Sequence, residues 1–145
     1  MKLSVIVPTR NRAHAVTLCL DSIAAAIVRA SPLDAEIVVV DNGSTDGTST
    51  AITGWANAND VAVNCLFEPR VGKSAALNCA MRAAQGNLFA FMDDDCRMHE
   101  EHLNDALRHD AADNELVLRS GRVELGDDDW CRRLESHTGL RYYHR

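Results

Sequence analysis

The sequence Asn87-Leu-Phe-Ala-Phe-Met-Asp-Asp-Asp95 joins an apolar run directly to three carboxylates. A short, continuous apolar run is typical of a strand that is covered on both faces of a parallel sheet. Three adjacent carboxylates repel one another, and this costs free energy unless a cation or hydrogen-bond donors compensate them. We therefore expect a buried strand that delivers Asp93, Asp94 and Asp95 to one edge of a sheet, where a metal ion would offset their charge.

Similar short apolar runs recur along the chain, and segments with helical periodicity separate them. In the first such segment Val16, Leu20 and Ile23 share one helical face. Alternating strands and helices predict an α/β fold, with right-handed βαβ units in a mostly parallel open sheet and helices on both faces. The expected strands are residues 3–7, 36–40, 61–67, 88–92 and 116–125, and the expected helices are residues 13–29, 48–58, 74–84 and 99–109.

The composition is that of one globular domain. The chain has 145 residues, of which 46% are apolar, and it has no apolar stretch of the ~18 residues that a membrane span needs. A net charge of −6 argues against a nucleic-acid partner. Five cysteines without a Cys-x-x-Cys spacing favour free thiols in a reducing compartment. We expect a single domain over residues 1–145, in the cytoplasm or at the cytosolic face of a membrane.

Polar residues follow each of the first four expected strands. They are Pro8 to Arg12, Asp41 to Ser44, Glu68 to Arg70, and Asp93 to Asp95. Taken singly, each segment can have a purely structural role, because Asn-Gly is a common turn and an acidic triplet can be a solvated loop or a helix N-terminus. Together they lie where open parallel sheets bind ligands, outside the carboxyl ends of the strands. Carboxylates there suit Mg²⁺ or Mn²⁺ and the diphosphate that such an ion would bridge.

The segment Val71-Gly-Lys-Ser74 is not a P-loop. That motif requires a glycine five residues before Gly72, and Phe67 stands at that position. Two interpretations of Lys73 stay open: a cation near the ligand, or an exposed lysine at the start of a helix.

Four segments together resemble the motifs of the family 2 glycosyltransferases, which have the Rossmann-like GT-A fold. These segments are Val5 to Arg12, Val38 to Gly47, Gly72 to Asn78 and Phe91 to Asp95. The resemblance covers most of the chain, in the same order and spacing. It implies a metal-assisted, inverting transfer of a sugar from a nucleotide diphosphate sugar, often UDP-linked, to an acceptor hydroxyl on a glycan, a lipid or another molecule.

The resemblance also implies roles for individual residues. Asp41 and Asn42 would contact the base and the ribose. Asp93 and Asp95 would form the DxD element, with Asp95 the main candidate ligand of Mn²⁺ or Mg²⁺ and Asp93 the second. The bound ion would neutralise the leaving diphosphate as a Lewis acid. The residues expected to bind the nucleotide sugar are Pro8, Thr9, Asn11, Asp41, Asn42, Arg70, Lys73, Asp93 and Asp94.

Two departures from the family pattern bear on the reaction. Many members carry a second acid where this chain has Asn42. The family's general base is an acid in the acceptor-binding half, usually well downstream of the DxD element. Asp127 to Asp129 and Glu135 are available carboxylates, but nothing aligns them with that base, and a solvated acidic turn is the favoured interpretation. We therefore expect a C-terminally truncated chain that lacks the acceptor-binding half, and the catalytic base stays unassigned.

Two other functions compete with that of a glycosyltransferase. The first is a non-catalytic nucleotide-sugar-binding module that needs a partner or a missing segment. The second is a nucleotidyltransferase, which also uses metal-bound carboxylates on an α/β sheet. That class typically has a glycine-rich, basic loop near the N-terminus, and this sequence has none.

Overall fold

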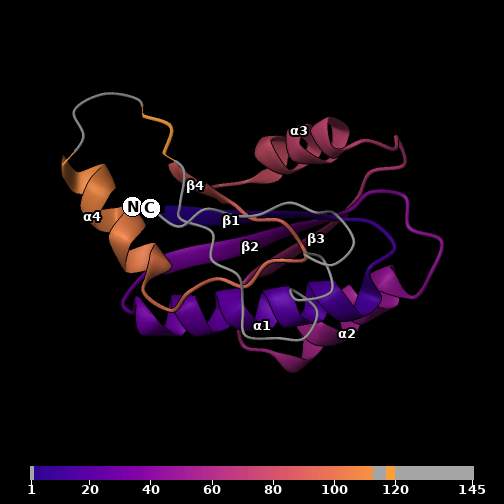
Figure 1. Cartoon of the computed structure of the whole chain (residues 1–145), viewed down its shortest axis with the longest axis horizontal. Coiled ribbons are helices and arrows are strands. Elements are labelled where there is room, and N and C mark those ends of the chain that lie inside the picture. Colours follow the sequence, from indigo (N-terminus) through magenta and orange to yellow (C-terminus); the bar gives the residue numbers. More distant parts are fainter. Residues whose placement is uncertain (1, 113–116, 120–145) are drawn as a thin grey trace, which may run out of the picture. The chain divides into compact units, whose positions relative to one another are not determined.

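The computed structural model describes residues 2–112 and 117–119, and strands and helices alternate along that part of the chain (Figure 1). In chain order the elements are β1 (Lys2–Thr9), α1 (Ala13–Arg29), β2 (Asp34–Asp41), α2 (Thr48–Ala58), β3 (Val63–Phe67), α3 (Lys73–Ala83), β4 (Leu88–Phe91) and α4 (His102–Ala112). All eight lie in a compact unit of residues 1–114, and residues 115–145 form a second unit.

The four strands form one parallel sheet in the order β3-β2-β1-β4. β2 pairs with one edge of β1, and β3 pairs with the far edge of β2. β4 pairs with the other edge of β1. The register places Thr9 beside Asp41, and Ile6 beside Phe91. The reversal of strand order at β1 separates the loops that follow β1 and β4, and in open sheets this arrangement creates a crevice for ligands.

Helices cover both faces of the sheet, with α1 and α2 on one side and α3 on the other (Figure 1). Along β1, Leu3 and Val5 belong to the core on the side of α1 and α2. Ile6 packs with Ala76 and Ala80 of α3 on the other side. All five of these residues are fully buried. Burial on both faces explains why the strands have continuous apolar sequences rather than alternating ones.

The predicted fold class is confirmed, as are the parallel strands and the helices on both faces. The helix expected over residues 99–109 instead begins at His102, because the ring and the carbonyl of His99 accept hydrogen bonds from the N–H groups of Glu101 and His102. The strand expected over residues 116–125 lies mostly outside the described residues, and residues 117–119 are not in a strand. The expected single domain over residues 1–145 stays a prediction.

Within the described part of the chain, none of the helices combines the length and the apolar character needed to cross a bilayer.

Candidate functional site

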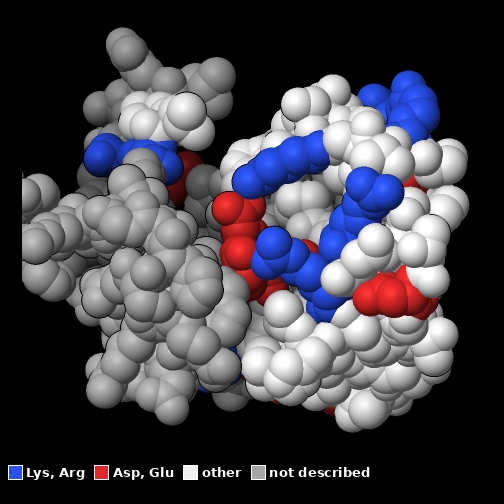
Figure 2. Space-filling model, turned by 45° about the vertical axis from the view of Figure 1, so that its right-hand side comes forward, with Lys and Arg blue, Asp and Glu red and all other residues white. Residues whose placement is uncertain are grey.

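A pocket of about 390 Å³ opens beyond the carboxyl ends of β1 and β4, where the strand order reverses. Figure 2 shows acidic and basic side chains side by side around a hollow on this face. The pocket is lined by Pro8, Thr9, Arg10, Arg12, Asn42, Val71, Gly72, Lys73, Asp93, Asp94 and Asp95.

Asp94 is the buried member of the acidic triplet. Its Oδ2 accepts a hydrogen bond of 2.6 Å from the hydroxyl of Thr9, and both residues are less than 10% exposed. Thr9 is the last residue of β1, so this bond joins the loop after β4 to the neighbouring strand. A buried carboxylate needs such partners because burial without them is costly. Asp94 therefore fixes the position of the triplet.

Asp95 pairs with Arg12. The Nη1 atom of Arg12 lies 2.6 Å from Oδ2 of Asp95 and 3.7 Å from Oδ1 of Asp94. The pKa of Arg12 is raised, first by the hydrogen bond with Asp95 and then by the charge of Asp94. The guanidinium thus compensates two of the three carboxylates.

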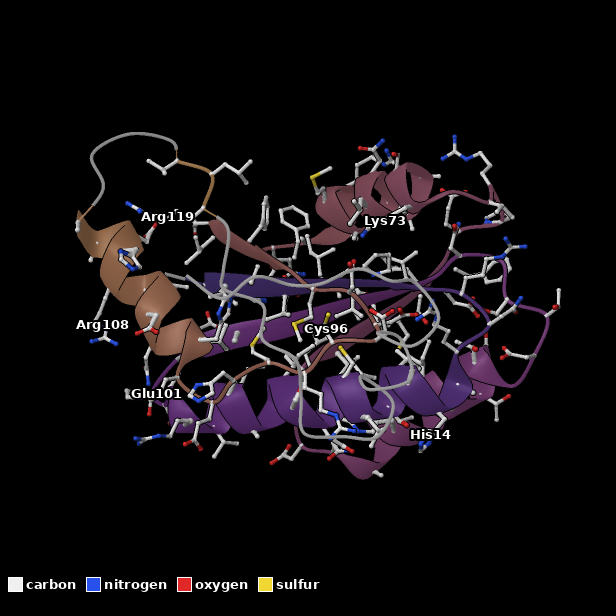
Figure 3. All side chains as sticks on the ribbon, viewed as in Figure 1. His14, Lys73, Cys96, Glu101, Arg108 and Arg119 are labelled. Carbon is white, nitrogen blue, oxygen red and sulfur yellow. The ribbon has the colours of Figure 1, made fainter. Side chains whose placement is uncertain are left out.

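Asp93 pairs with Lys73, the first residue of α3. The distance between Nζ and Oδ1 is 2.5 Å, and the hydrogen bond with Asp93 raises the pKa of Lys73. Figure 3 shows Lys73 on the α3 side of the sheet, whereas Cys96, just after the triplet, lies on the α1 side. Arg12 and Lys73 therefore reach the acidic triplet from different segments of the chain: Arg12 precedes α1, and Lys73 begins α3.

The charges that line the pocket cancel. Arg10, Arg12 and Lys73 are basic, and the three residues of the triplet are acidic. The sequence showed the carboxylates at this edge, but it did not show that the protein itself supplies an equal number of cations.

Asn11 and Asp41 are not among the residues that line the pocket. The N–H of Asn11 donates to Ser44 Oγ, and its Oδ1 accepts from the N–H of Thr45, each at 2.8 Å. Asp41 is buried and accepts hydrogen bonds from the N–H of Ser44 and from the hydroxyl of Ser49. Both side chains are therefore engaged in holding the loop that follows β2.

Asn42 lines the pocket, but its amide is engaged with the loop that follows β3. Its Nδ2 donates to the carbonyls of Glu68, at 3.0 Å, and Arg70, at 2.8 Å. Its Oδ1 accepts from the N–H of Gly72 at 2.7 Å. An amide has two N–H donors and one carbonyl acceptor, and here all three are in use. In this structure the side chain of Asn42 therefore anchors the segment that leads into Lys73.

Arg70 is turned toward Glu68 and does not line the pocket. Its Nε and Nη2 donate to the two carboxylate oxygens of Glu68 at 2.9 and 2.8 Å. These hydrogen bonds from Arg70 lower the pKa of Glu68 to about 2. Bidentate pairs of this kind fix geometry as well as charge.

The acidic triplet has the oxygen donors that Mg²⁺ or Mn²⁺ would require. Mg²⁺ is typically bound through one or two carboxylates together with substrate phosphates and water. The side chains of Asp93 and Asp95 are 53% and 35% exposed, so both are accessible from the pocket. Among the described residues no three acidic, histidine or cysteine side chains converge as a complete metal site. The donors fit a cation that shares its coordination with a diphosphate.

The structure brings seven of the predicted site residues into the pocket lining: Pro8, Thr9, Asn42, Lys73, Asp93, Asp94 and Asp95. It adds Arg10, Arg12, Val71 and Gly72, which the sequence analysis did not select. The sequence feature that could have indicated Arg12 as a pocket residue is its place in the polar segment after the first strand. Its orientation depends on Asn11, whose φ of 53° turns the chain in a way that periodicity does not encode. Asp127 to Asp129 and Glu135 lie outside the described residues.

Known proteins with similar sequences and structures are glycosyltransferases. The glycosyltransferase AglE of Haloferax volcanii is 33% identical over 101 residues, which cover 70% of this chain and 33% of that protein. The mannosyltransferase PcManGT from Pyrobaculum calidifontis, solved in complex with GDP-Man and Mn²⁺, is 36% identical with a TM-score of 0.67, covering 73% of this chain and 31% of that chain. TarS 1–349 of S. aureus, solved in complex with UDP-GlcNAc, is 31% identical with a TM-score of 0.64, covering 77% and 32%.

This chain spans about a third of the length of each of these three proteins. Its sheet has the GT-A fold of these structural neighbours. The sequence model of glycosyl transferase family 2 matches residues 4–145, nearly the whole chain. The chain therefore belongs to glycosyl transferase family 2.

Proposed function

We propose that this chain is the donor-binding part of an inverting glycosyltransferase that uses a nucleotide diphosphate sugar, UDP-linked, and Mn²⁺ or Mg²⁺. The observation that carries the proposal is the acidic triplet beside β1, at the reversal of strand order, in a pocket that also holds Arg10, Arg12 and Lys73. Such a pocket offers oxygen donors for a divalent cation and basic groups for phosphate. The complexes of TarS with UDP-GlcNAc and of PcManGT with GDP-Man and Mn²⁺ support this proposal.

The roles of the residues follow from their positions. Asp95, with Asp93, would hold the divalent cation, which when bound supplies Lewis-acid stabilisation of the leaving diphosphate. Thr9 holds Asp94 and so keeps the triplet at the pocket wall. Lys73 offers an ammonium group beside Asp93. Asp41 and Asn42 shape the loops around the pocket, next to the place proposed for the base and ribose.

The proposed reaction is a single displacement. The oxygen of the acceptor hydroxyl forms a bond to the anomeric carbon of the sugar while the bond from that carbon to the diphosphate oxygen breaks. The nucleotide diphosphate leaves with the electron pair, and a general base takes the hydroxyl proton. The base and the acceptor stay unassigned. A non-catalytic donor-binding module is the alternative, and it would bind the donor without transferring the sugar.

Calorimetry with UDP tests the donor site. We expect UDP to bind in the presence of Mn²⁺ and to bind much more weakly in EDTA, because without the ion the basic groups of the lining are balanced by the triplet and no net positive charge is left to hold the diphosphate. Asp95→Ala should abolish the metal-dependent part of the affinity and leave the fold intact, as judged by circular dichroism. Asp60→Ala, which removes an exposed carboxylate in the loop after α2, is the matched control. Equal UDP affinity with and without EDTA would contradict the metal role.

A cytoplasmic location is also proposed. Cys19, Cys65, Cys79 and Cys96 are free thiols, and free thiols are usual in a reducing compartment.

A further inference from the structure

Arg12 occupies the position on the acidic triplet where a divalent cation would bind. Its Nη1 lies 2.6 Å from the same Asp95 carboxylate that is the main candidate metal ligand. In the structure the triplet is thus neutralised by cations of the protein itself. A cation that binds Asp95 through Oδ2 has to compete with this guanidinium, because Arg12 already occupies that oxygen and repels a second positive charge beside it.

We propose that Arg12 is exchanged between two anions: it holds Asp94 and Asp95 in the free protein, and it moves to the diphosphate of the donor when a divalent cation takes its place. This inference rests on the proposed function and assigns Arg12 a role in donor binding. It makes Arg12 both a competitor of the metal ion and a ligand of the nucleotide.

The backbone of Arg12 is fixed while its side chain is free to turn. Its N–H donates to Thr48 Oγ1 at 2.9 Å, and its carbonyl accepts the N–H of Val16 at 3.0 Å. These bonds hold the residue at the start of α1 whatever the side chain does. The side chain itself is 46% exposed, lines the pocket and makes no capping hydrogen bond to the helix. In the described part of the chain its side chain pairs with Asp94 and Asp95, so an exchange of partners breaks these two contacts.

The charge balance favours a movement of this kind. Before binding, the three basic and three acidic residues of the lining cancel. A divalent cation bound to Asp95 adds roughly two positive charges and releases the guanidinium, so the pocket then attracts an anion such as a diphosphate. Metal and nucleotide should therefore strengthen each other's binding, and by linkage the coupling is reciprocal.

The test compares Arg12→Gln with Arg10→Gln. Each removes one positive charge from the pocket lining, but of these two arginines only Arg12 has a described pairing with the triplet. In Arg12→Gln we expect the affinity for Mn²⁺ alone, measured by electron paramagnetic resonance of free Mn²⁺, to rise about three- to tenfold. We expect the affinity for UDP at saturating Mn²⁺, measured by calorimetry, to fall about tenfold. Arg10→Gln should change the Mn²⁺ affinity by less than about twofold, through screened charge alone.

An exchange predicts that Arg12→Gln raises the affinity for Mn²⁺ and lowers the affinity for UDP, whereas a structural defect would lower both affinities. Weaker binding of both Mn²⁺ and UDP by Arg12→Gln would overturn the inference, because loss of structure weakens both. Equal tightening of Mn²⁺ in the two variants would overturn it as well, because net charge alone would then explain the effect. Arg12→Met, which also lacks the charge, should repeat the pair of shifts.

Different results would overturn the proposed donor binding and the proposed exchange of Arg12. A wild-type chain that binds no UDP, with or without Mn²⁺, would overturn donor binding as such. Normal metal-dependent UDP binding by the wild type, without the pair of opposite shifts in Arg12→Gln, would overturn only the exchange.

Discussion

At the scale of single residues, Asn42 is tied to the backbone of the loop after β3 by both of its N–H groups and its carbonyl. Two carbonyls and one N–H face it, and this pattern matches an amide. A carboxylate offers only acceptors at neutral pH and would face the carbonyls of Glu68 and Arg70 without a proton to share. The chemical type of this side chain thus determines the position of Gly72 and Lys73.

Asn42→Asp should loosen this loop. We expect a loss of about 1–3 kcal/mol in the free energy of unfolding, because the carbonyls of Glu68 and Arg70 lose their donors and meet a negative charge. Urea denaturation measures the change, with Asn57→Asp on the exposed face of α2 as the control. A loss no larger than in the control would show that water replaces the amide without cost.

The structure brings several of the residues that the sequence indicated into one pocket, and local contacts hold others outside its lining. Thr9, Lys73 and the acidic triplet follow directly from strand ends, and the structure brings them together. Asn11 was expected in the pocket in place of Arg12. The left-handed φ of Asn11 directs its side chain to the loop after β2, and neither residue type nor spacing reports this turn. Arg70 was expected beside the nucleotide, but Glu68 binds it.

At the scale of elements, the loop between β3 and α3 is held at two points. Asn42 anchors it from β2, and the bidentate pair between Arg70 and Glu68 closes it on itself. Gly72 then enters α3 with a φ of 144°, a conformation that side chains rarely adopt. The loop is therefore shaped before any ligand arrives.

The pair between Glu68 and Arg70 predicts that this loop loses stability in acid. Arg70 lowers the folded-state pKa of Glu68 to about 2, below the ~4.3 of an unperturbed glutamate. The pair's contribution to stability is thus complete above pH ~4.3 and is lost as the pH falls through about 2. As the pH is lowered between these two values, the free energy of unfolding should fall less steeply in Glu68→Gln than in the wild type. Urea denaturation midpoints measured across the pH series test this.

The control for this pH series is Glu100→Gln, which removes an exposed carboxylate before α4. Parallel pH curves for the wild type and Glu68→Gln would contradict the assignment.

The elements themselves were predictable because their signals are local. Apolar runs and helical periodicity gave the eight elements of the described sheet and its helices, and most boundaries agree closely. The start of α4 was missed because it depends on hydrogen bonds to His99 rather than on periodicity. The strand order was not predictable in detail, since pairing of β4 beside β1 is a long-range choice.

At the scale of the whole molecule, the pocket exists only where distant segments meet. Thr9 and Asp94 are 85 positions apart in sequence, and Lys73 comes from a third segment. A ligand that binds this pocket therefore binds only the folded sheet and should stabilise it as a unit.

UDP with Mn²⁺ should raise the melting temperature of the chain. At a hundred times the dissociation constant the linkage is worth about 2.7 kcal/mol, which corresponds to roughly 5–10 °C for a chain of this size. Differential scanning fluorimetry measures the rise, and uridine, which lacks the diphosphate, should give little of it. An equal rise with uridine would show that the diphosphate contributes nothing to binding.

The position of β4 beside β1 also has a consequence during synthesis. The ribosome makes β1, β2 and β3 first, and these can pair with one another before β4 exists. At about 5–20 residues per second, the 85 positions between Thr9 and Asp94 take roughly 4–17 s to translate. Within that interval, once β1 and β2 have paired, the nascent sheet has an open edge at β1 and no acidic triplet. A ligand that needs the acidic triplet can therefore stabilise only the chain whose fourth strand has already docked beside β1.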